Sequence, residues 1–197
     1  MKPSLWSDAS PDRWTAALAR YPAVIDAQGV ASLPAHDAWY REELPSAVAA
    51  RVPRHVTHAE LVRLTEWKMA RGEWRARNLV LVRSNAEVEV ARVTGEAIAL
   101  APHPTKPIAL VATLAGVGPA TASAVLAAAE PAHYPFFDEL VAAQVPELGP
   151  VRWTLGYYAR YAEALRTRAR SLGDAWTPVA VERALWAQAG GKAGTRE

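Results

Sequence analysis

The amino-acid sequence predicts an all-α protein. Apolar residues recur at helical spacing through most of the chain, capping residues precede most of these segments, and almost nothing alternates in the manner of a strand. The alternation at Val88 and Val90 is an exception, but a lone strand would have no partner. At 197 residues and 51% hydrophobic, the chain is long enough for one compact domain. We expect this domain over 1–189, in one or two helical lobes, followed by a flexible tail over 190–197.

Capping residues and helix breakers set the expected helix bounds. Ser10 begins the first helix, and Thr57 with Glu60 forms a capping-box pattern that begins another, which Gly72 ends. Thr177 caps the last helix. The expected helices cover 11–20, one or two segments within 33–51 interrupted at Pro45, 61–70, 76–83, 86–99, 108–114, 119–126, a short one from 139, 151–172 and 178–188.

Composition excludes some classes of protein. Without cysteine there is neither a disulfide nor an iron–sulfur cluster, and no apolar run is long enough for a membrane span. The start of the chain lacks the apolar core of a signal peptide, so we expect an intracellular protein: cytoplasmic or nucleoid-bound in a bacterium, nuclear in a eukaryote. A net charge of +2 is compatible with nucleic-acid binding without arguing for it.

Two glycines, Gly116 and Gly118, separate the segments 108–114 and 119–126 and predict a tight hairpin between two helices. Pro119 suits the first position of the second helix. The amides at a helix N-terminus attract phosphate oxygens, and such contacts are independent of base sequence. The hairpin therefore predicts a site that binds the phosphate backbone of a nucleic acid.

A lone carboxylate, Asp138, follows the hairpin within an apolar run. Together these features resemble the helix-hairpin-helix glycosylase superfamily of base-excision repair, which carries a Leu-Pro-Gly-Val-Gly hairpin, then Thr-Ala, then an apolar-apolar-Asp-x-x-Val segment. The spacing between hairpin and acid is similar to that of the family. The matching residues are Leu114, Gly116, Val117, Gly118, Thr121, Ala122, Phe136, Phe137, Asp138 and Val141.

The resemblance implies that Asp138 is the catalytic residue, which stabilises an oxocarbenium-like sugar and helps to activate water after the target base has left the stack. It also implies that the hairpin binds the DNA backbone, and we assign that role to Gly116, Val117, Gly118, Ala120 and Thr121. The alternative for Asp138 is a helix cap for the segment that starts at 139, and both roles can hold at once.

Bifunctional members of that family carry a lysine in the second hairpin helix, which forms a Schiff base with the sugar. Here that position is Ala120, so the resemblance implies a monofunctional enzyme that leaves an abasic site. Ala115 stands where the family has proline, a minor departure. No cofactor and no structural metal are expected, because the histidines lack metal-ligand spacing.

A second motif covers 66–75 and resembles a Trp-Lys-x-x-Arg-Gly-x-aromatic-Arg pattern of a little-characterised branch of these proteins, notably in fungi. That branch is also similar over 118–123 and 181–186. Arg71 and Arg75 are candidate phosphate ligands, and Lys68 could replace the missing hairpin lysine if it lies near Asp138. Trp67 and Trp74 are expected in the core, with stacking on a base as the alternative.

The expected base pocket contains Tyr134, Phe137 and Lys68. Tyr157 and Tyr161 can share one helix face, where we expect them to pack into the core.

The sequence therefore predicts a monomeric, monofunctional DNA glycosylase that binds double-stranded DNA through its phosphates. Two alternatives stay open: a non-catalytic protein that binds DNA or senses damage, and a protein-interaction scaffold in which the eight tryptophans serve an interface.

Overall fold

The computed structural model describes residues 4–193, and every regular element in that range is helical, which confirms the all-α class. The elements are the 3₁₀ turn η1 (Leu5–Ser7), α1 (Pro11–Ala19), α2 (Tyr21–Asp26), α3 (Leu33–Ala38), the π-helical turn η2 (Trp39–Glu43), α4 (Leu44–Ala50), α5 (His58–Arg71), α6 (Ala76–Arg83), α7 (Glu87–Ala99), α8 (Lys106–Val111), α9 (Pro119–Ala129), α10 (Glu139–Ala142), the 3₁₀ turn η3 (Pro146–Leu148), α11 (Leu155–Leu172) and α12 (Pro178–Gln188).

Side-chain caps place several helix starts. The Thr57 hydroxyl accepts a hydrogen bond from the Glu60 amide at 3.3 Å, and Glu60 accepts one from the Thr57 amide at 2.9 Å. This reciprocal pair is a complete capping box, as the sequence predicts, and α5 begins directly after Thr57, three residues before the expected start at 61. The Thr177 hydroxyl caps α12 in the same manner, by accepting from the Ala180 amide.

Several expected bounds differ from the structure, and two of the differences have clear local reasons. The helix expected from 151 begins at Leu155, because the hydroxyl of Thr154 accepts from the Tyr157 amide and makes Thr154 the cap. Pro45 does not interrupt the segment 33–51. It lies in the first turn of α4, just after the π-helical turn, where the missing amide costs little.

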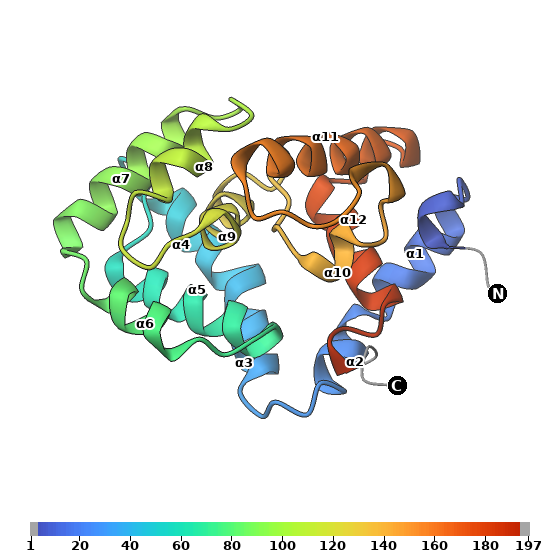
Figure 1. The fold of residues 1–197 in the computed structure, drawn as a ribbon, viewed down its shortest axis with the longest axis horizontal. Coiled ribbons are helices and arrows are strands. Elements are labelled where there is room, and N and C mark those ends of the chain that lie inside the picture. The colour runs from blue at the N-terminus through green and yellow to red at the C-terminus, as the bar shows by residue number, and fades with distance from the viewer. Residues whose placement is uncertain (1–3, 194–197) are drawn as a thin grey trace.

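The two ends of the described chain lie together (Figure 1). Helices α1 and α2 pack against α12, which also packs against α11. On the other side, α7, α8 and α9 follow one another, and α5 packs against both α6 and α9 (Figure 1). The hairpin helix α9 lies near the middle of the molecule (Figure 1), and the short helix α10 packs against α12.

Large aromatic side chains fill the core, where Trp14, Trp67 and Trp186 are completely buried. Trp67 stacks on Tyr40 with ring centroids 3.6 Å apart. The expectation that Trp74 is also a core residue was wrong: it is 59% exposed, because α5 ends before it and the following loop carries it outward.

The first part of the expected tail is attached to the body of the protein. The side chain of Gln28 makes both contacts. Its Nε2 donates to the Gly190 carbonyl, and its Oε1 accepts from the Ala193 amide at 2.9 Å. The remainder of that tail, 194–197, lies outside the described residues.

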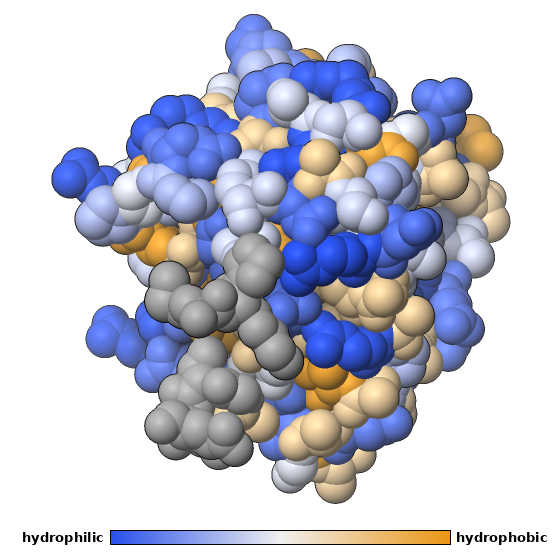
Figure 2. Space-filling view, turned by 90° about the vertical axis from the view of Figure 1, so that its right-hand side faces the viewer, coloured by the Kyte–Doolittle hydropathy of each residue, from blue (hydrophilic) through white to orange (hydrophobic). Residues whose placement is uncertain are grey.

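The face turned toward the viewer in Figure 2 mixes hydrophilic and hydrophobic residues wherever grey atoms do not cover it. Within 4–193, no helix combines the length and the apolar character that crossing a membrane requires.

Candidate functional site

The hairpin between α8 and α9 is fixed to the rest of the protein by a side chain that the sequence analysis missed. Asn85 donates from Nδ2 to the Ala115 carbonyl at 3.0 Å, and its Oδ1 accepts from the Ala115 amide at 2.9 Å. Asn85 follows α6, 30 residues away from the hairpin along the chain. This paired contact gives the turn a defined position relative to α6.

Gly116 makes the closest approach between the hairpin and α6. Its φ is +74°, a region that favours glycine, and a Cβ atom there would lie 2.6 Å from the Asn78 carbonyl oxygen and 2.9 Å from the Val82 amide. The φ of Gly118 is −98°, and a Cβ atom there would meet nothing within 4 Å. Gly116 therefore serves packing, whereas Gly118 leaves the start of α9 open.

We expect Gly116→Ala to lower the free energy of unfolding by about 2–4 kcal/mol, because strained backbone and overpacking add at this position. Gly118→Ala is the matched control, with an expected loss of about 1 kcal/mol or less at a helix N-cap. Urea denaturation of both variants measures the difference. Equal stabilities would contradict the close packing of Gly116 on α6.

The N-terminus of α9 has no side-chain cap. Since Pro119 has no amide, the first-turn amides of Ala120 and Thr121 are the groups that can bind an anion there. The Val117 amide is used within the turn, where it donates to the Leu114 carbonyl at 3.1 Å. The Val117 amide is therefore not free to bind a phosphate in this conformation, and the assignment of Val117 to DNA binding stays a prediction.

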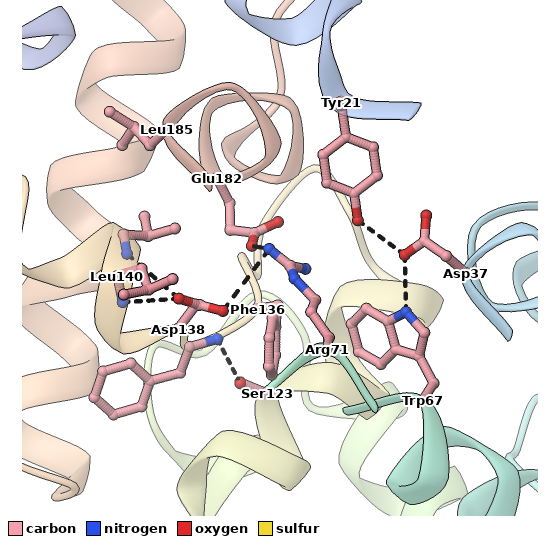
Figure 3. A network of polar contacts seen from close by, with 12 residues as sticks. Tyr21, Asp37, Trp67, Arg71, Ser123, Phe136, Asp138, Leu140, Glu182 and Leu185 are labelled. Carbon is pink, nitrogen blue, oxygen red and sulfur yellow. Dashed lines mark hydrogen bonds and ion pairs between the residues drawn. The ribbon is translucent and has the colours of Figure 1, made fainter. Parts of the chain in front are cut away.

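The segment that carries Asp138 is held by hydroxyl groups from two helices. Ser123 of α9 accepts from the Phe137 amide at 2.8 Å, which ties the acid segment to the hairpin helix (Figure 3). From α11, Tyr158 donates to the Pro135 carbonyl and Tyr161 donates to the Phe136 carbonyl at 2.7 Å. These hydrogen bonds hold the segment before Asp138 in a defined position relative to the hairpin helix α9.

Asp138 caps α10, as one of the two interpretations predicts. Its Oδ1 accepts from the Leu140 amide at 2.8 Å and more weakly from the Val141 amide at 3.4 Å. The side chain is only 12% exposed. Burial raises the pKa of Asp138, while the Arg71 guanidinium and the two amides oppose that rise.

Asp138 also borders a cavity of about 290 Å³. The hairpin helix contributes 118–121 and the acid segment contributes 136–139. The cavity therefore joins the two motifs that the sequence analysis singled out. Its other lining residues are Lys68, Gly72, Glu73, Arg75, Asn78, Trp153 and Lys192.

Lys68 and Arg75 enter this cavity from α5 and from the loop after it. Burial of Lys68 and the positive charge of Arg75 lower the pKa of the Lys68 amine. The Arg75 side chain is 60% exposed and forms an ion pair with Glu73 at 2.8 Å, so Arg75 is accessible to a phosphate. The structure thus brings Lys68 into the same cavity as Asp138.

Arg71 lies elsewhere. Its side chain is 1% exposed, and its guanidinium forms an ion pair with the completely buried Glu182 of α12 (Figure 3). A phosphate cannot reach it, so the expectation that Arg71 binds the DNA backbone was wrong. The physical reason is that Arg71 lies on the buried face of α5, one turn after Trp67.

The two aromatic residues expected in the pocket have different positions. Phe137 lines the cavity. Tyr134 does not line it: the ring is fully buried, and the hydroxyl donates to the His103 carbonyl at 2.8 Å. Burial raises the pKa of Tyr134 to about 12, so its hydroxyl is a structural donor.

Trp153 is the aromatic residue that the sequence analysis missed. It lies in the loop before α11, is 46% exposed, and its ring centroid lies 4.7 Å from that of Phe137. The sequence analysis placed Trp153 inside the helix expected from 151, whereas the true start at Leu155 leaves it in the preceding loop. With Trp153 and Phe137, the cavity has an aromatic wall beside its carboxylate.

The chain was also compared with known proteins. No family model matches it, and neither a curated protein nor a solved structure does.

Proposed function

We propose that this protein is a monofunctional DNA glycosylase that acts on a flipped, damaged base. One observation carries the proposal: the uncapped start of α9 and the largely buried Asp138 carboxylate border the same cavity. A backbone phosphate on the Ala120 and Thr121 amides would bring the adjacent nucleotide to the carboxylate.

In this proposal, Asp138 stabilises the positive charge that develops on the sugar as the N-glycosidic bond breaks. Water adds to the sugar carbon with loss of a proton, and the base leaves with a proton, so the products are a free base and an abasic site. The aromatic wall formed by Phe137 and Trp153 offers a surface on which a base can stack. Arg75 supplies an accessible positive charge for a second phosphate.

The test is base release from a set of duplex oligonucleotides, each with one defined lesion and an undamaged duplex as the control. Because Ala120 replaces the Schiff-base lysine, we expect strand breaks at one lesion only after treatment with hot alkali. Breaks without alkali would contradict a monofunctional enzyme. Borohydride trapping of wild type and Lys68→Met would then show whether the Lys68 amine forms the imine.

A second candidate function is a DNA-binding protein that recognises damage without cleavage. It is favoured by the hydrogen bonds of Asp138, whose Oδ1 is already occupied as a helix cap. Salt-dependent binding to a damaged duplex, without base release from any member of the set, would support this function over the first.

A further inference from the structure

Two arginines and three carboxylates form a buried ion network behind the cavity: Asp37, Arg41, Arg71, Asp138 and Glu182. Asp138 is the only one of the five that lines the cavity, while the side chains of the other four are at most 10% exposed. The network therefore connects the buried core with the carboxylate of the proposed reaction. Figure 3 shows its part around Arg71, Asp138 and Glu182.

Arg71 is shared unequally between two carboxylates. Its Nη2 forms a close hydrogen bond with Oε1 of Glu182 but lies 3.8 Å from Oδ2 of Asp138, beyond hydrogen-bond length. Among the described residues, Nε and Nη1 of Arg71 have no hydrogen-bond partner. The position of the guanidinium therefore depends mainly on Glu182.

Glu182 is held independently of Asp138. Its Oε2 lies 3.6 Å from Nη2 of Arg41, and Arg41 in turn donates to the Tyr21 hydroxyl at 3.0 Å. Asp37 accepts from both Tyr21 and Trp67 at 2.8 Å, which fixes the far end of the network. Glu182 thus has a second cation in the core, Arg41, besides its close contact with Arg71.

We propose that Glu182 is a positioning residue, which holds Arg71 on itself and thereby leaves the Asp138 carboxylate loosely paired at the cavity. This inference rests on the proposed function, in which Asp138 is the catalytic carboxylate. An arginine that bound Asp138 closely would occupy its oxygens and neutralise its charge. The carboxylate could then stabilise a developing positive charge on a sugar less well.

Several other charged or titratable groups lie near Asp138, and together they determine the direction in which its pKa should shift. Lys68 and Arg71 are cationic and come from α5, whereas Glu139 follows Asp138 directly and Tyr161 comes from α11. Removal of the Glu182 charge takes away a nearby anion and releases Arg71 toward Asp138. Both effects favour the ionised carboxylate, so Glu182→Gln is expected to lower the pKa of Asp138.

The experiment is a titration of the Asp138 carboxyl carbon by NMR in the full chain. Glu139→Gln is the matched control, because it removes a neighbouring negative charge without touching Arg71. We expect the midpoint to move to lower pH in Glu182→Gln, and to move further than in Glu139→Gln. Equal midpoints in the two variants would overturn the proposal.

Arg71→Lys provides a second measurement if Glu182→Gln does not fold. We expect the shorter lysine side chain to stay on Glu182 with its ammonium farther from Asp138 than the guanidinium is, so the midpoint should move to higher pH. An unmoved midpoint would overturn the proposal.

The titration needs no activity, so its failure and that of the proposed function are distinguishable. Shifted midpoints without base release from any lesion would support the positioning role and contradict the glycosylase. Base release with unshifted midpoints would support the glycosylase and contradict the positioning role. Where both hold, the acid limb of base release should follow the Asp138 midpoint, since the ionised carboxylate is the working form.

Discussion

Replacement of Asp138 by Asn should reduce base release by about 10²–10⁴-fold and leave DNA binding intact. The loss follows because a neutral amide can neither stabilise the positive charge on the sugar nor accept a proton from water. The fold should survive, since Asn is as good a helix cap as Asp and can still accept from the Leu140 amide. Single-turnover base release and binding titrations on the same damaged duplex measure the two effects.

Asp174→Asn is the matched control for this substitution, because Asp174 lies on an exposed loop between α11 and α12. We expect the control to keep the wild-type rate. If Asp138→Asn also kept that rate, Asp138 would be a helix cap alone and the glycosylase proposal would fall. A parallel loss of DNA binding and activity would instead show that Asp138 maintains the structure of the site.

Replacement of Arg71 by Met should lower the free energy of unfolding by about 3–5 kcal/mol. The substitution leaves the completely buried carboxylate of Glu182 without its closest partner, and an uncompensated buried charge is strongly destabilising. The guanidinium also lies 4.4 Å from the ring centroid of Trp186, a contact that the variant would change. Urea denaturation followed by circular dichroism measures the loss.

Arg75→Met is the comparison, since Arg75 lies just four positions later but is exposed. Its surface ion pair with Glu73 is worth about 0–1 kcal/mol, so its stability should be close to that of wild type. Under the proposed function, this variant should instead weaken DNA binding and reduce the slope of log Kd against log salt by about 0.9. If Arg71→Met were as stable as Arg75→Met, the buried ion pair would contribute nothing to the fold.

The sequence predicts most helix starts because caps are local. The hydroxyl of Thr57 or Thr177 meets an amide three residues later, so the contact can be read from spacing alone. Thr154 is also a local cap, but the apolar residues before it extend the helical pattern and hide the true start. Pro45 does not break the helical segment because a π-helical turn precedes it, and nothing in the local pattern marks that turn.

The burial of charge could be predicted only in part. Arg71 lies at helical spacing from Leu64 and Trp67, and Glu182 lies one turn before Trp186, so each occupies the apolar face of its helix. That pattern identifies two buried charges of opposite sign. It cannot identify them as partners, because 111 residues separate them along the chain.

By itself, the sequence determined the all-α class, the glycine hairpin and the acid segment that follows it, since each depends on residues close together in the chain. The tertiary structure alone decided that 118–121, Asp138, Lys68 and Trp153 border one cavity. It also decided that Arg71 faces Glu182 in the core and Arg75 faces solvent. These outcomes depend on how α5, α9, α11 and α12 pack together. The local sequence does not specify which helix faces contact each other.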